Sequence, residues 1–111
     1  MNNLKLALLN TTIATTDGVY EIKTVNLKTA ILLVENNIGN IDSAIGHKST
    51  AYVMSTLLKT PIDMNRQLFL QQAGQTALVF KLKGRPEEGK ILSVKEIENI
   101  GYEFKTIKRL K

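Results

Sequence analysis

Cysteine is absent from this 111-residue chain, and histidine occurs once, as His47. A chain without cysteine has no disulfide framework, and one histidine without cysteine cannot complete the usual zinc-ligand spacings. We therefore expect no metal and no other cofactor, so any catalysis has to rely on ordinary side chains.

Aromatic residues are also few, with three phenylalanines, three tyrosines and no tryptophan. Proteins that bind single-stranded nucleic acid stack successive bases on aromatic side chains, and this chain lacks such a platform. Its formal net charge of +5 favours anionic partners, although lysines scattered over a solvated surface would give the same value. A small phosphorylated ligand fits this composition better than a long nucleic acid.

Long apolar runs are missing as well, and the first residues lack the basic region and cleavage site of a signal peptide. These absences predict a cytoplasmic protein with no membrane partner. A chain of 111 residues suits a single domain over 1–111, which is too small for a deep enclosed cleft. A sizeable ligand is therefore expected at the interface of a homodimer.

Hydrophobic patterns predict an α/β (α+β) domain in which helices pack on a mixed sheet, with the order β-β-α-β-α-β-β-α-β. The run over 4–9 is almost entirely apolar, which indicates a central strand with both faces covered. The other strands are expected over 19–25, 41–45, 63–72, 75–83 and 102–107, and the helices over 27–34, 50–58 and 94–100.

Caps and turns delimit these elements. Asn26 is placed to cap the first helix, and Ser93 begins a sequence with capping-box spacing before the last helix. Gly74 lies in the turn between the fourth and fifth strands, which form the clearest hairpin in the pattern. The basic end of the chain, 108–111, is expected to be frayed.

The histidine stands at the junction between a predicted strand and a predicted helix. Gly46 lets a ligand approach the backbone, and Lys48 adds a positive charge. The free backbone N–H groups of Lys48, Ser49 and Thr50 would face an anion. The pattern indicates a phosphate site with a proton-transfer group attached. The alternative is that Ser49 is an ordinary N-cap and His47 a surface residue.

Asn10, Thr11 and Thr12 follow the first predicted strand. Polar residues at the end of a buried strand commonly contact ligands, and they are equally common as turn formers. Both interpretations stay open for this segment.

The segment 84–90 gathers Arg85, two glutamates and a lysine between two glycines. Charged loops are usually only solvated. However, arginine forks match phosphate oxygens, and a nearby carboxylate can orient a histidine or an arginine. With His47 and Arg66, these residues would suffice to break an RNA phosphodiester. The ribose 2′-hydroxyl is then the nucleophile, and the protein aligns it, stabilises the phosphorane charge and protonates the leaving 5′-oxygen.

Three spaced motifs resemble those of the viral ring nucleases: IGHxST at 45–50, NR at 65–66 and RxEEGKIL at 85–92. Members of that family are small proteins of archaeal viruses, bacteriophages and some bacteria, and act as anti-CRISPRs against type III systems. The resemblance covers essentially the whole chain. It implies a homodimeric α/β fold that binds cyclic tetraadenylate across the two-fold axis. It also implies metal-independent cleavage to linear di-adenylates ending in a 2′,3′-cyclic phosphate.

The resemblance further implies catalytic roles for His47 and Glu88, and ligand-holding roles for Arg66 and Arg85. The remaining ligand-binding positions are found near the start of the chain and in the fifth strand. Asn10 matches the family's asparagine, and either Thr11 or Thr12 takes the place of its serine, as in the bacterial and phage members. Lys81 stands where the family has a glutamine.

Three other functions compete with a ring nuclease. A module that sequesters a cyclic oligoadenylate or another nucleotide would need the same site, except that it requires no proton donor at His47. A small basic viral protein that binds duplex DNA would need a cationic helix face, which the helix over 50–58 lacks. A structural protein without a ligand would leave the conjunction of His47, Arg66, Arg85 and Glu88 unexplained.

Overall fold

The apolar run predicted as a central strand forms β1, Leu6–Leu9, and all of its residues are buried. The computed structural model describes residues 4–84 and 92–111. In it β1 pairs in parallel with β3 (Ile41–Ser43) on one side and with β4 (Thr76–Leu82) on the other. Because both edges and both faces of β1 are covered, apolar side chains are favoured at every position. The prediction for this strand is confirmed.

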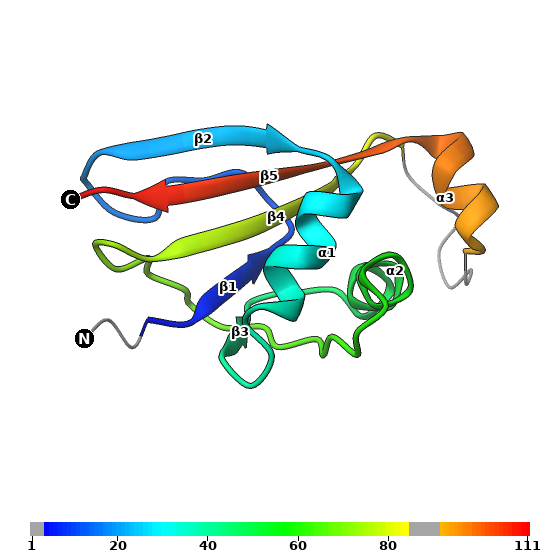
Figure 1. Ribbon diagram of the computed structural model, residues 1–111, viewed down its shortest axis with the longest axis horizontal. Helices are drawn as coiled ribbons and strands as arrows, with labels where there is room; N and C mark the ends of the chain where they lie inside the picture. The colour runs from blue at the N-terminus through cyan, green and yellow to red at the C-terminus, as the bar shows by residue number, and fades with distance from the viewer. Residues whose placement is uncertain (1–3, 85–91) are drawn as a thin grey trace.

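The described residues form a five-stranded sheet in the order β2-β5-β4-β1-β3 (Figure 1). β5 (Tyr102–Arg109) runs antiparallel to both β4 and the edge strand β2 (Tyr20–Val25). Parallel pairs on one half of the sheet and antiparallel pairs on the other make the sheet mixed. The predicted single α+β domain is confirmed.

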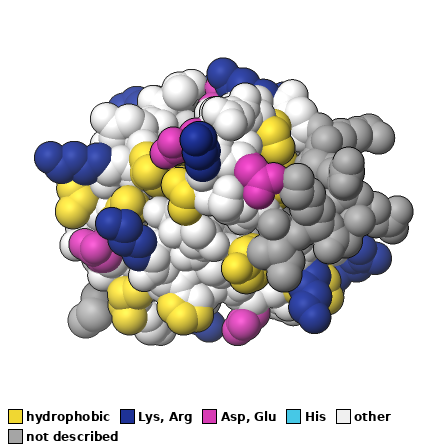
Figure 2. All heavy atoms as spheres, turned by 90° about the vertical axis from the view of Figure 1, so that its right-hand side faces the viewer, with side chains coloured by type: hydrophobic (Ala, Val, Ile, Leu, Met, Phe, Trp, Pro, Cys, Tyr) yellow, Lys and Arg dark blue, Asp and Glu magenta, His cyan; other side chains and the backbone are white. Residues whose placement is uncertain are grey.

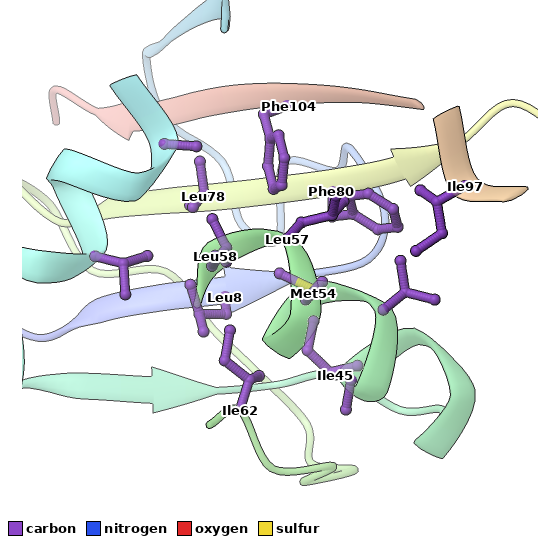
Figure 3. Close-up of a cluster of buried hydrophobic side chains, with 14 of the residues drawn as sticks. Leu8, Ile45, Met54, Leu57, Leu58, Ile62, Leu78, Phe80, Ile97 and Phe104 are labelled. Atoms are coloured by element: carbon purple, nitrogen blue, oxygen red, sulfur yellow. The ribbon is translucent and has the colours of Figure 1, made fainter. Parts of the chain in front are cut away.

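Three helices pack on one face of this sheet: α1 (Leu27–Glu35), α2 (Lys48–Leu58) and α3 (Val94–Ile100). Figure 3 shows the buried cluster that joins them to the strands, with Phe80 of β4 next to Ile97 of α3. No helix within residues 4–84 or 92–111 has the length and apolar character needed to cross a bilayer.

The helix caps confirm the local sequence signals. The Asn26 side chain accepts a hydrogen bond from the Thr29 backbone N–H at 2.8 Å, at the start of α1. Ser93 and Glu96 form a reciprocal capping box before α3, in which each side chain accepts from the other residue's backbone N–H at 3.2 Å. Both caps satisfy backbone donors that have no partner within the helix.

The opposite face of the sheet is covered by connecting segments. Phe69 packs against the buried centre of this face. The Gln71 backbone N–H donates to Thr15 Oγ1 at 2.8 Å, and this bond joins the segment that carries Phe69 to the segment that carries Thr15. The buried residues of this face are Ala7, Leu9, Ala77, Val79 and Ile107. The centre of the sheet is therefore buried on both sides, although the helices lie on one.

No strand forms over 63–72, so the predicted hairpin is wrong, although Gly74 does lie in a turn. The two edges of β4 are already occupied by β1 and β5, and a hairpin partner has no free edge to pair with. The segment is held instead through side chains. Buried Gln71 donates its amide to the backbone oxygens of Gln75 and Ile107, both at 2.8 Å.

The predicted fraying of 108–111 is also wrong. β5 continues to Arg109, which pairs with the first residue of β2. The Arg109 guanidinium donates to the backbone oxygen of Gln71 at 2.7 Å and to that of Asp17 at 3.1 Å. A basic composition suggested a solvated tail, but acceptors from two distant segments hold this end in place.

Candidate functional site

Three parallel strands end at the same edge of the sheet. Asn10 directly follows β1, and the chain leaving β3 reaches His47 after three residues. Figure 1 shows β1 and β4 pointing toward the same end of the molecule. In open sheets of this kind, ligands bind beyond the carboxyl ends of parallel strands. The segments that begin with Asn10 and that carry His47 therefore follow neighbouring strands at one end of the fold.

His47 is the N-cap residue of α2. Its backbone is extended (φ −131°, ψ 130°), and its side chain makes no capping hydrogen bond and is exposed. The alternative in which Ser49 is the N-cap is wrong, because the helix already begins at Lys48 and Ser49 is its second residue. The N–H groups of the first helical turn have no acceptor within the helix. An uncapped helix start therefore adjoins the imidazole.

Arg66 lies directly against the loop that carries His47. Its Nη2 and Nε donate to the backbone oxygen of Gly46 at 2.8 and 3.2 Å. A Cβ built on Gly46 would lie 3.6 Å from Arg66 Nε, which is an ordinary contact. A guanidinium has five N–H donors, so the Arg66 side chain is anchored while Nη1 has no partner among the described residues. The structure thus brings Arg66 next to the residue preceding His47.

The residues flanking Arg66 fasten the same segment to β3. The Asn65 backbone N–H donates to Ile45 O at 2.9 Å, and the Asn65 amide donates to Ser43 O at 2.9 Å. Gln67 Nε2 donates to Ser43 O at 2.7 Å. Arg66 is consequently positioned by its neighbours as well as by its own bonds. Sequence reasoning missed these anchoring amides, whose partners are about twenty residues away in the chain.

Asn10, Thr11 and Thr12 make no side-chain hydrogen bond with the described part of the chain, and both threonines are exposed. Lys81 is exposed on β4 and stands opposite Glu103 of β5. Since Phe80 faces the helices, strand alternation places Lys81 on the other face of the sheet. The structure therefore separates Lys81 from the face that carries α2.

Arg85 and Glu88 lie outside the described residues. Their roles, and those of the other site residues, stay predictions. Within residues 4–84 and 92–111 no three His, Cys, Asp or Glu side chains gather as a metal would require. Figure 2, which faces the end toward which β1 and β4 point, shows basic, acidic and apolar side chains intermixed in small groups.

A hollow on the described surface lies beside the candidate residues and includes one of them, Lys48. Its volume is about 1160 Å³, and α2, β3 and the segment 60–65 surround it. The predicted ligand-binding residue Lys48 lines it beside His47, and Asn65 lines it beside Arg66. Tyr52, one turn after Lys48, also lines it. Sequence reasoning passed over Tyr52, although its position off the buried stripe of α2 was a signal.

Comparison with known proteins finds relatives in viruses and in a bacterium. A family model described as STIV B116-like matches residues 6–104. YddF of Bacillus subtilis (strain 168) is 32% identical over 107 residues, covering 96% of this chain and 99% of YddF. ORF117 of Acidianus two-tailed virus is 33% identical over 92 residues, covering 82% and 79%. Protein 26 of Sulfolobus islandicus filamentous virus is 40% identical over 86 residues, covering 76% and 70%.

A solved structure has the same fold. B116 of Sulfolobus turreted icosahedral virus superposes with a TM-score of 0.84 at 29% sequence identity, covering 95% of this chain and 99% of B116.

Proposed function

This chain belongs to the STIV B116-like family, and we propose that it is a metal-independent ring nuclease that binds cyclic tetraadenylate and cleaves it to linear di-adenylates. The products end in a 2′,3′-cyclic phosphate. Such an activity removes the second messenger of type III CRISPR signalling. The proposal rests on the sequence resemblance together with the arrangement around His47.

One observation carries it: an exposed histidine at an uncapped helix start, with an arginine anchored to the adjacent carbonyl. The Arg66 guanidinium is held at Gly46 O by two hydrogen bonds, at 2.8 and 3.2 Å. The first N–H groups of α2 and this guanidinium both favour an anion. A phosphate bound between them would have the His47 imidazole beside it.

In the proposed reaction a ribose 2′-oxygen attacks the adjacent phosphorus. The bond from phosphorus to the 5′-oxygen of the next nucleoside breaks, and that oxygen takes a proton from His47. Arg66 and Arg85 stabilise the phosphorane charge. The attacking hydroxyl releases its proton to solvent, and Glu88 is the proposed partner either of His47 or of that hydroxyl. Two such cleavages open the ring into two halves, and no water molecule is consumed.

A homodimer fits the symmetry of the substrate. A ring of four identical nucleotides has a two-fold axis, and two protomers related by the same axis would each present one His47 to it. Asn10 and one of Thr11 or Thr12 are assigned to the ligand from the sequence resemblance, and both threonines are exposed.

The decisive experiment is incubation of the purified protein with labelled cyclic tetraadenylate in excess EDTA. We expect di-adenylates with cyclic phosphate ends, at the rate seen without chelator. Activity that disappears in EDTA and returns with magnesium or manganese would contradict the metal-independent reaction. Tight binding without any cleavage would identify a sequestering protein instead.

A further inference from the structure

The hollow beside α2 is open to solvent and large enough to admit a small molecule. Its volume of about 1160 Å³ lies slightly above the range of roughly 300–1,000 Å³ typical of ligand pockets. Three large apolar side chains that line it are strongly exposed: Tyr52 at 49%, Ile38 at 60% and Met64 at 49%. These side chains therefore have exposed apolar surface that a bound molecule could cover.

Tyr52 is the distinctive member of this lining. All six aromatic residues fall within the described part of the chain, and Tyr52 is the only one whose side chain is exposed. The others are buried or half-buried in the two hydrophobic clusters. An exposed aromatic ring is suited to stacking a planar base, which every nucleobase permits through its π face.

The polar groups at the rim match a nucleotide. Lys48, which directly follows His47, lines the hollow, and its ammonium makes no hydrogen bond or ion pair with the described residues. The Asp63 carboxylate, also in the lining, likewise has no side-chain partner among them. The ammonium would attract a phosphate, whereas the carboxylate would accept a hydrogen bond from an exocyclic amine.

We infer that this hollow holds a purine base and its ribose, stacked on Tyr52, while the attached phosphate lies toward Lys48 and the start of α2. The inference rests on the proposed function, since it seats one nucleotide of the substrate beside His47. A peptide or a second copy of the chain would also cover apolar side chains. The nucleotide is favoured because a cation, a free carboxylate and one aromatic ring line the same hollow, and Lys48 of that lining directly follows His47.

The test is an NMR titration of the full-length protein with AMP, adenosine and inorganic phosphate. AMP and adenosine are expected to shift resonances of Tyr52, Ile38 and Met64, and phosphate alone is expected to spare them. Tyr52→Ala should weaken AMP binding by about 5- to 100-fold, whereas Tyr52→Phe should retain it. Leu32→Ala is the matched control, because Leu32 is also 49% exposed on a helix.

Equal AMP affinity for Tyr52→Ala and the parent, or shifts that map elsewhere, would overturn the inference. The two proposals fail separately. If Tyr52→Ala leaves the affinity for cyclic tetraadenylate unchanged while the ring is still cleaved, the base site is wrong and the ring nuclease stands. If AMP binds through Tyr52 but the ring is never cleaved, the base site stands and the ring nuclease is wrong.

Discussion

At the scale of single residues, His47 is the position whose replacement is most informative. Its side chain makes no hydrogen bond to the helix it precedes, so His47→Ala should leave the thermal midpoint almost unchanged. Loss of the proton donor is expected to slow ring cleavage by about 10²–10⁴-fold. The affinity for the ring should survive, because Arg66 and the start of α2 remain in place.

The measurement is single-turnover cleavage of cyclic tetraadenylate, with binding measured in parallel. Lys59→Ala, just beyond the other end of α2, is the control and should cleave like the parent. A His47→Ala protein that cleaved at the parental rate would show that the imidazole is an ordinary surface group.

Arg66 is expected to affect binding rather than chemistry alone. Arg66→Ala should weaken ring affinity by about 1.5–3 kcal/mol, the usual contribution of a hydrogen bond to a charged group. Lys28→Ala, at an exposed position on α1, should change the affinity far less. Isothermal titration with both variants makes the comparison. Unchanged affinity in Arg66→Ala would remove Arg66 from the site.

At the scale of elements, the end of β5 is expected to be a structural anchor. Arg109→Ala loses the hydrogen bonds to Gln71 O and Asp17 O and leaves both acceptors without that donor. We expect a loss of about 1–3 kcal/mol in the free energy of unfolding, measured by urea denaturation.

Lys108→Ala is the matched control for this prediction. Lys108 is exposed, so its replacement should change stability by no more than about 0.5 kcal/mol. Equal stability of the Arg109 and Lys108 variants would mean that the bonds at the end of β5 contribute nothing measurable.

At the scale of the whole molecule, the proposed activity requires two chains. One protomer alone would present half of a two-fold site, so sedimentation at assay concentrations should give twice the mass of the chain. Diluting the protein until it dissociates should reduce cleavage in proportion to the dimer that remains. A monomer with full turnover would contradict the shared site.

Local signals were sufficient for most of the elements. β1 follows from its unbroken apolar run, and α1 and α3 follow from caps at Asn26 and Ser93. Each of these patterns depends on residues no more than four apart, so it can be recognised in the sequence. The candidate site residues, including His47 and Arg66, were also identified in the sequence from the chemistry of their side chains. Their roles stay predictions that the experiments above test.

Only the tertiary structure decided which sheet edges were free and which distant groups meet. The alternating pattern over 63–72 is compatible with a strand, but β1 and β5 already occupy both edges of β4. Arg66 reaches Gly46 across twenty residues, and Arg109 reaches Gln71 across thirty-eight. Such contacts depend on how the whole chain packs. For the same reason, the sequence alone does not reveal the hollow at Tyr52, because β3, α2 and the segment 60–65 form it together.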